Sequence, residues 1–342
     1  MSKQAIKKKA ERRVDEKELL YSDPRLLDLL LLDRSTKKNI IWATNDYSTL
    51  GEEFSFYAPI TSKQLLENPS LIIPRSQKAL ENQIQRSKAK AEVFTPSWVC
   101  NKQNNQIDNA WFGKATNRFN KELICGWEST YSRKDPNDFR DRIKFPTKTG
   151  KTWKDYVLDT RIEISCGEAP YLTSRYDTVT GKFIRPKNRI GLLDRKLRVI
   201  TENTSIAPLW LNWAEKALQS TYGFEWQGDN VFLARKNILL SIIEYYECLY
   251  HTILKPERIY KFAEIISWNI WQMDGIKFVV PNSCHEINES KLTLLGDVVS
   301  SRPCPGCKTG NNKHHTGVYS LIKDWKADTI VQFIETMEDY SL

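Results

Sequence analysis

The sequence contains no apolar stretch long enough to cross a bilayer. Its most apolar run, residues 26–32, is interrupted by Asp28, whereas a membrane-spanning helix needs about 20 consecutive apolar residues. The N-terminus is charged and is not followed by the apolar segment that a secretory signal peptide carries. We therefore expect a cytoplasmic protein with no membrane partner.

A disulfide framework is not expected either. The seven cysteines are an odd number, and nothing in the sequence indicates secretion. In a reducing compartment, cysteines remain thiols or bind metal ions. The sequence also lacks an internal repeat, and it nowhere places two prolines side by side.

Positive charge and aromatic side chains are abundant. Lys and Arg number 51 against 42 Asp and Glu, a net charge of +9, and there are 11 Trp and 14 Tyr. A basic balance favours a polyanionic partner such as nucleic acid, and aromatic rings can fill a core or stack on bases. Basic residues cluster within residues 7–13, 75–90 and 182–198. A solvated surface is the alternative interpretation of each cluster.

The chain divides by pattern into three regions. Residues 1–90 form a mixed N-terminal region ending in a helical connector, residues 91–282 form a central unit, and residues 283–342 form a Cys/His module. The periodicity of apolar residues predicts strands at 39–42, 161–165, 222–225 and 277–280 and helices at 206–220, 230–250 and 256–271. Alternating strands and helices in the central unit predict an α/β fold with a mainly parallel sheet.

A glycine-containing turn follows the first strand of the central unit. Residues 163–172 read Glu-Ile-Ser-Cys-Gly-Glu-Ala-Pro-Tyr-Leu. Glycine at position 167 lets the backbone approach a bound cofactor closely. Glu163, just before the turn, can interact with the positive end of a cofactor. An ordinary strand and turn is the alternative interpretation.

This turn resembles the cofactor loop of amino-methyltransferases, Asp-Pro-x-Cys-Gly-x-Gly-x-Phe-Leu. The matching places are taken by Glu163, Cys166, Gly167, Tyr171 and Leu172. Ala169 stands where the family has its second glycine. With further similar stretches at residues 39–47, 91–105, 191–199 and 222–230, the chain resembles the methyltransferase (M) subunits of bacterial restriction-modification systems.

The resemblance extends to an upstream segment. Residues 91–99 resemble the Phe-x-Thr-Pro motif that precedes the core in N6-adenine methyltransferases of restriction systems. Phe94, Thr95 and Pro96 match it. In that family the threonine and the backbone help to enclose the cofactor, and the resemblance implies the same role here.

Two acidic residues complete the implied cofactor site. Glu225 ends the second strand, where the family has a carboxylate that accepts hydrogen bonds from the ribose hydroxyls. Asp274, within residues 268–275, would follow a third strand and face the adenine amino group. The end of a helix is the alternative interpretation of residues 268–275.

The resemblance implies a Rossmann-like, S-adenosylmethionine-dependent methyltransferase core at residues 91–282. About fifty residues separate its two cofactor segments, where a simple βαβ unit needs about 30. Residues 173–205 are therefore interpreted as a basic insertion that could touch phosphates, with a lid or a structural hairpin as alternatives. The implied function is methyl transfer to adenine N6 in DNA, with restriction or specificity subunits as possible partners.

One family motif is missing. These enzymes carry Asn/Asp-Pro-Pro-Tyr/Phe, which binds the target amine and stacks on the flipped base, and the sequence has no such tetrapeptide. The chain is thus either a methyltransferase or its cofactor-binding half, or a non-catalytic DNA-binding or assembly subunit. A nuclease using Asp159 and Glu163 is a third hypothesis, although no Glu-x-Lys follows Asp159 at the needed spacing.

The C-terminal region carries a separate motif, Cys304-Pro-Gly-Cys307. Together with Cys284 and one histidine of the pair at 314 and 315, for which we take His314, these cysteines predict a tetrahedral structural zinc site. Two free thiols are the alternative. A redox function is disfavoured because no thioredoxin-like βαβ pattern follows. Such a zinc module would brace the fold or grip DNA.

Overall fold

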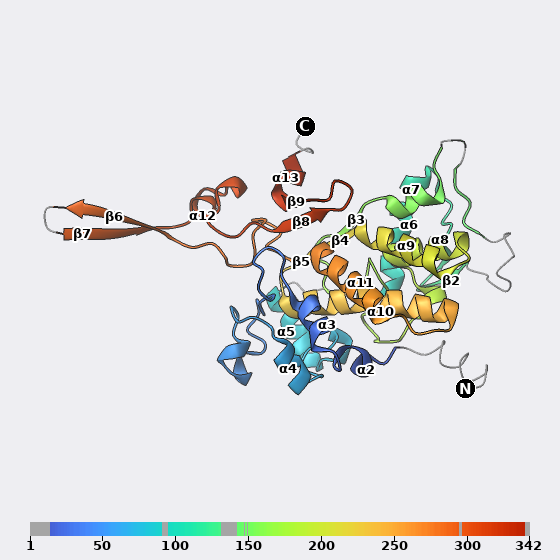
Figure 1. Ribbon diagram of the computed structural model, residues 1–342, viewed down its shortest axis with the longest axis horizontal. Helices are drawn as coiled ribbons and strands as arrows, with labels where there is room; N and C mark the ends of the chain where they lie inside the picture. Colours follow the sequence, from blue (N-terminus) through green and yellow to red (C-terminus); the bar gives the residue numbers. More distant parts are fainter. Residues whose placement is uncertain are drawn as a thin grey trace.

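A three-stranded parallel sheet lies at the centre of the computed structural model, which describes residues 14–90, 95–130, 142–146, 148, 150–293 and 296–338 (Figure 1). Its strands are β3 (Arg161–Glu163), β4 (Thr221–Glu225) and β5 (Ile270–Gln272), in the order β3-β4-β5. Both pairs are parallel. The carboxyl ends of all three strands therefore meet at one edge, as the alternating pattern predicted.

Two predicted strands do not form. Residue Val279 makes only an isolated bridge to Tyr319, and Ile41 makes only an isolated bridge to Pro59. The third strand of the sheet instead directly follows the preceding helix, within residues 268–275. A β-branched and aromatic run predicts extended backbone, but it cannot show whether a neighbouring strand is in reach.

Helices make up most of the rest of the fold. In chain order they are α2 (Glu16–Leu20), α3 (Pro24–Leu31), α4 (Ser62–Glu67), α5 (Leu80–Lys90), α6 (Ser97–Phe112), α7 (Trp153–Leu158), α8 (Leu192–Asn203), α9 (Ala207–Gln219), α10 (Gly228–Tyr250) and α11 (Pro256–Asn269). Short 3₁₀ helices are η1 (Ser48–Leu50), η2 (Glu52–Phe54), η3 (Arg75–Gln77), η5 (Pro186–Asn188) and η6 (Asn312–His314).

Helix α10 runs through the middle of the core. Every side chain from Gly228 to Tyr246 is buried, as expected of a helix that is enclosed on all sides rather than amphipathic. One hydrophobic cluster joins side chains from Leu20 to Ile270. The N-terminal region, the helices and the sheet thus share a core, and the domain boundaries at residues 90 and 282 stay predictions.

The basic stretch 173–205 turns much of its charge inward. Helix α8 lies within it, and ten consecutive residues of this helix, 192–201, are buried. The partners of its cations are intramolecular: Arg189 pairs with Glu244, Arg195 with Asp108 and Arg198 with Glu202, and Lys196 donates to the carbonyl oxygens of Asp159 and Ser220. These four side chains are therefore engaged inside the protein and do not form the phosphate-contacting surface that the sequence suggested.

Antiparallel hairpins flank this core. The first is β1 (Asn120–Leu123) with β2 (Gly126–Ser129), and the second, β6 (Ile287–Thr293) with β7 (Gly296–Arg302), projects away from the rest of the chain (Figure 1). The chain then forms α12 (Pro305–Thr309), the hairpin of β8 (Leu321–Asp324) and β9 (Thr329–Gln332), and α13 (Phe333–Glu338). Phe333 packs against Phe224 and Trp271 of the sheet. None of the helices in the described residues is long and apolar enough to cross a membrane.

Candidate functional site

The turn after β3 has an unusual backbone. Ser165, Gly167 and Ala169 all have positive φ values, of 50°, 51° and 63°. Glycine adopts this left-handed conformation without cost, whereas a residue with a Cβ atom is strained there. The amide of Cys166 donates to the carbonyl oxygen of Phe224 at 2.8 Å. The turn is thereby fixed against the neighbouring strand β4.

Glu163 closes this turn from inside. Its carboxylate accepts hydrogen bonds from the amides of Tyr171 and Leu172, at 3.3 and 3.1 Å, and the residue is 8% exposed. Burial raises the pKa of Glu163 well above its usual value, although the two amides oppose the shift and the charge of Glu225 adds to it. The structure thus gives Glu163 a loop-closing role at the predicted position.

Glu225 meets the same turn from β4. Its Oε2 accepts a hydrogen bond from the amide of Gly167 at 2.8 Å, and its Oε1 accepts from the amides of Trp226 and Gln227 at 2.9 and 3.2 Å. Burial raises the pKa of Glu225, and these three amides oppose the shift. The turn at Gly167 and the carboxylate of Glu225, which are 58 positions apart in the sequence, therefore converge at one edge of the sheet.

The upstream Thr-Pro motif lies against the same turn. Pro96 caps the N-terminus of α6. The carbonyl oxygen of Thr95 accepts a hydrogen bond from Thr178 at 2.9 Å, and Asn104 of α6 donates to the carbonyl oxygen of Tyr171 in the turn at 3.0 Å. Phe94 lies outside the described residues. Helix α6, which begins directly after Pro96, therefore contacts the turn, and a role of Thr95 and Pro96 in enclosing a cofactor stays a prediction.

Asp274 follows β5, the third strand of the sheet. Its carboxylate accepts hydrogen bonds from the amides of Ile276 and Lys277, at 2.9 and 3.1 Å, and so closes a tight turn. The side chain is buried. The sequence placed Asp274 correctly after a strand, and its visible contacts are those of a turn-capping residue.

A second group of candidate functional residues, three cysteines and one histidine, lies at the base of the β6–β7 hairpin. Cys284 precedes β6, Cys304 and Cys307 follow β7, and His315 follows η6. Each offers one ligand atom, and these atoms all lie within 4.8 Å of one another. This Cys₃His cluster could hold a metal ion.

The distances fit a tetrahedral site. The sulfur atoms of Cys284, Cys304 and Cys307 lie 3.5, 3.6 and 3.7 Å from Nδ1 of His315. Zinc binds thiolate sulfur at about 2.3 Å and imidazole nitrogen at about 2.0–2.1 Å, so the sulfur–nitrogen edge of a tetrahedron is about 3.5–3.6 Å. The donor set and its spacing are therefore compatible with a metal ion such as zinc.

The histidine of the cluster is His315, not His314 as the sequence interpretation had it. His314 is the last residue of η6, and the chain presents the following side chain to the cysteines. A Cβ atom on Gly306 would lie 2.6 Å from Nδ1 of His315. The glycine of the Cys-Pro-Gly-Cys motif thus makes room for the ring, a close approach that the spacing of the motif alone does not show.

The pKa values of two thiols of the cluster, Cys304 and Cys284, shift in opposite directions. Burial acts to raise the pKa of Cys304, but hydrogen bonds from Thr316 and His315 outweigh it and lower the pKa to about 5. The Thr316 amide donates to the sulfur of Cys304 at 3.2 Å. By contrast, burial and hydrogen bonds with the other two cysteines raise the pKa of Cys284 to about 12.

Comparison with protein-family models, curated proteins and solved structures finds no match to this chain.

Proposed function

We propose that the carboxyl edge of β3, β4 and β5 binds S-adenosylmethionine and that the chain is a DNA-directed, methyltransferase-like subunit of a restriction-modification system. One observation carries the proposal: the amide of Gly167 and the carboxylate of Glu225 meet at 2.8 Å. A glycine turn after one parallel strand and an acid at the end of the next are the parts from which Rossmann-type folds build a nucleoside site.

The topology supports a Rossmann-like core. Doubly wound nucleotide-binding folds consist of two halves, each with three successive parallel strands side by side. The order β3-β4-β5, with α8 and α9 before β4 and α10 and α11 before β5, corresponds to one such half. Within the described residues, β3 pairs with β4 and with no second strand. The side chains of Ile162 in β3 and of Ile164 just after it are 43% and 70% exposed.

The contacts of Glu225 limit how the ribose would bind. A carboxylate has about four acceptor positions, and backbone amides fill three of those on Glu225. One position is left, so the carboxylate can accept one ribose hydroxyl without rearrangement, rather than two. The bound cofactor would supply the methyl group, and Glu225 would orient its nucleoside.

Titration of the full chain with S-adenosylmethionine by calorimetry tests this proposal. We expect Glu225→Gln to weaken binding by about 10- to 100-fold, the loss expected for one hydrogen bond to a charged group. Asp194→Asn is the matched control, because Asp194 is also buried and accepts the amides of Ser174 and Gly191. Absence of binding at millimolar cofactor would refute the proposal.

A non-catalytic role is the second candidate. It is favoured by the missing Asn/Asp-Pro-Pro-Tyr/Phe tetrapeptide, without which the chain has no recognisable group to bind the target amine of a flipped adenine. Transfer of a tritiated methyl group to DNA, measured with and without the products of neighbouring genes, separates the candidates. Transfer by the chain alone indicates an enzyme, transfer only with a second protein indicates a cofactor-binding half, and none indicates an assembly or DNA-binding subunit.

For the Cys₃His cluster, we propose a structural zinc ion held by Cys284, Cys304, Cys307 and His315. Four protein ligands leave no open position for a substrate, which is typical of structural rather than catalytic zinc. The ligands come from both ends of the β6–β7 hairpin, so the metal would tie these ends together. Metal analysis of the purified chain should find one zinc per chain, reduced to below about one tenth in Cys304→Ser but unchanged in Cys125→Ser, whose thiol is exposed and outside the cluster.

A further inference from the structure

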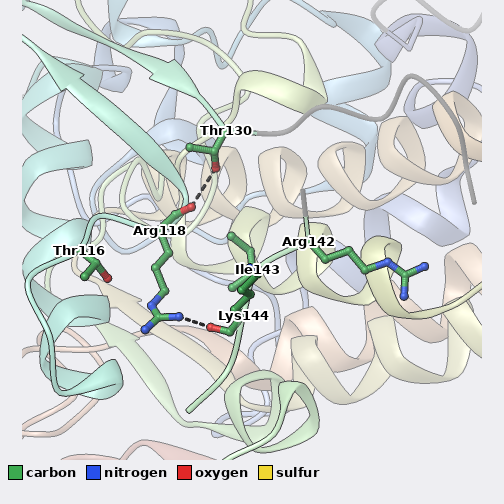
Figure 2. A pocket seen from close by; sticks show the side chains of 6 residues that line it. All are labelled: Thr116, Arg118, Thr130, Arg142, Ile143 and Lys144. Atoms are coloured by element: carbon green, nitrogen blue, oxygen red, sulfur yellow. Dashed lines mark hydrogen bonds between the residues drawn. The ribbon is translucent and has the colours of Figure 1, made fainter. Parts of the chain in front are cut away.

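A cleft of about 410 Å³ opens where the β1–β2 hairpin joins the rest of the chain (Figure 2). Two segments form it, the residues next to the hairpin and the segment 142–144. Among the described residues, those that line it are Thr116, Arg118, Thr130, Arg142, Ile143 and Lys144. Three of these six side chains are cationic and none is acidic, so the cleft presents a positive surface.

The structure fixes Arg118 at this cleft. Its guanidinium donates a hydrogen bond to the carbonyl oxygen of Lys144 and lies 4.5 Å from the ring centroid of Phe112. The hydroxyl of Thr130 donates to the carbonyl oxygen of Arg118 at 2.8 Å. The Nε atom of Arg118 is buried and has no hydrogen-bond partner among the described residues. Arg118 is thus held in place by its neighbours.

In the part of the chain that the structure describes, neither Arg118 nor Lys144 forms an ion pair. The acidic side chain in contact with the segment, Glu202, accepts from the amide of Ile143 and pairs with Arg198 at 2.7 Å. This arrangement contrasts with the basic stretch around α8, where each buried cation has an internal partner.

The positive surface continues beyond the cleft. The Nζ atom of Lys151 lies 4.7 Å from the ring centroid of Trp111 and donates a hydrogen bond to the carbonyl oxygen of Trp111 at 2.9 Å. Trp111 packs edge-on against Phe112, the ring that carries Arg118. Cations supported on neighbouring rings keep their charge at the surface and lose little mobility on binding.

We propose that this cleft binds phosphate groups and that the phosphodiester backbone of nucleic acid supplies them. A guanidinium presents paired donors that match phosphate oxygens. Figure 2 shows the guanidinium groups of Arg118 and Arg142 on opposite sides of residues 143–144. Arg118 and Lys144 place two cations along this open polar cleft, which suits successive phosphates of a chain, whereas small ligands favour enclosed, mostly apolar pockets. The proposal does not depend on the methyl-donor site.

Fluorescence anisotropy with labelled duplex and single-stranded oligonucleotides tests it on the full chain, over salt concentrations from about 50 to 200 mM. The test variant is Arg118→Gln/Lys144→Gln. The matched control, Arg25→Gln/Lys63→Gln, removes the same charge from exposed side chains elsewhere. Lys144→Gln alone is included because the Lys144 side chain is exposed, so that its replacement should leave folding intact. Inorganic phosphate is titrated separately.

We expect the test variant to bind nucleic acid at least tenfold more weakly. The slope of log affinity against log salt should fall by about 2, because each cation that no longer meets a phosphate lowers it by about 1. Lys144→Gln should reduce the slope by about 1, and the control should leave it unchanged. A second outcome is that the test variant binds nucleic acid as the wild type does, while inorganic phosphate stabilises the wild type and not the test variant. The cleft then binds free phosphate, and the assignment to nucleic acid is wrong. Variants that match the control with both ligands, or a chain that binds neither, would overturn the proposal.

Discussion

Replacement of Glu225 should destabilise the protein in proportion to the number of amides that lose their acceptor. Its carboxylate accepts from the amides of Gly167, Trp226 and Gln227 and is only 8% exposed. A buried donor without a partner costs about 1–3 kcal/mol, so Glu225→Ala should cost about 3–9 kcal/mol. Glu225→Gln keeps one oxygen that accepts from the amides of Trp226 and Gln227, and leaves only the Gly167 amide without an acceptor. This variant should therefore lose about 1–3 kcal/mol of stability.

Because a domain is stable by only about 5–15 kcal/mol, Glu225→Ala approaches complete unfolding. The glutamine variant is therefore the one suited to ligand-binding experiments. Urea denaturation followed by circular dichroism measures both costs. Glu128→Ala, which removes an exposed carboxylate, should change stability by less than about 0.5 kcal/mol. A cost for Glu225→Ala no larger than that of this control would show that the three hydrogen bonds do not hold the turn.

Three further predictions concern the metal cluster and the buried acid of β3. Removal of metal by a chelator should lower the midpoint of thermal unfolding in the wild type but not in Cys304→Ser; equal shifts would contradict the ligand assignment. Gly306→Ala should lose bound zinc because its Cβ would lie 2.6 Å from the ring of His315, whereas Gly126→Ala, with no atom within 4 Å of the added Cβ, should retain it. Burial raises the pKa of Glu163 above its unfolded value, so its stabilising contribution is complete below about pH 4 and is lost as the pH rises through the folded pKa. Urea denaturation should therefore show that the free energy of unfolding of Glu163→Gln, relative to that of the wild type, increases as the pH rises from about 4 to 7. A difference that stays constant across that range would contradict the raised pKa.

The sequence predicted two of the three parallel strands, β3 and β4, and the meeting of the turn at Gly167 with Glu225. Patterns of apolar residues identified β3 and β4, and the parallel arrangement then required their carboxyl ends to meet. The Gly167–Glu225 contact is the consequence. Local patterns succeed here because each of these two strands is short and bounded by a turn.

Whether a charged side chain is buried or exposed could not be predicted in the same way. Arg195 and Lys196 are adjacent on a strongly basic stretch, which favours a solvated surface, yet both are buried. Arg195 pairs with Asp108, 87 positions away. A partner that distant leaves no signal in local composition, so the charge of a segment says little about which of its cations face solvent. The cations left over at Arg118 and Lys144 emerge only once the internal pairs are known.

Ala169 stands where the amino-methyltransferase pattern that the turn resembles has a glycine. Its φ of 63° is a left-handed conformation that glycine adopts without strain. An alanine in this conformation costs about 1–2 kcal/mol, but the side chain is fully buried and belongs to the hydrophobic core. Its methyl group therefore points into the protein rather than toward the exposed side of the turn at Ser165. The positive φ strains the turn, and burial of the methyl group offsets about 0.8 kcal/mol of that strain.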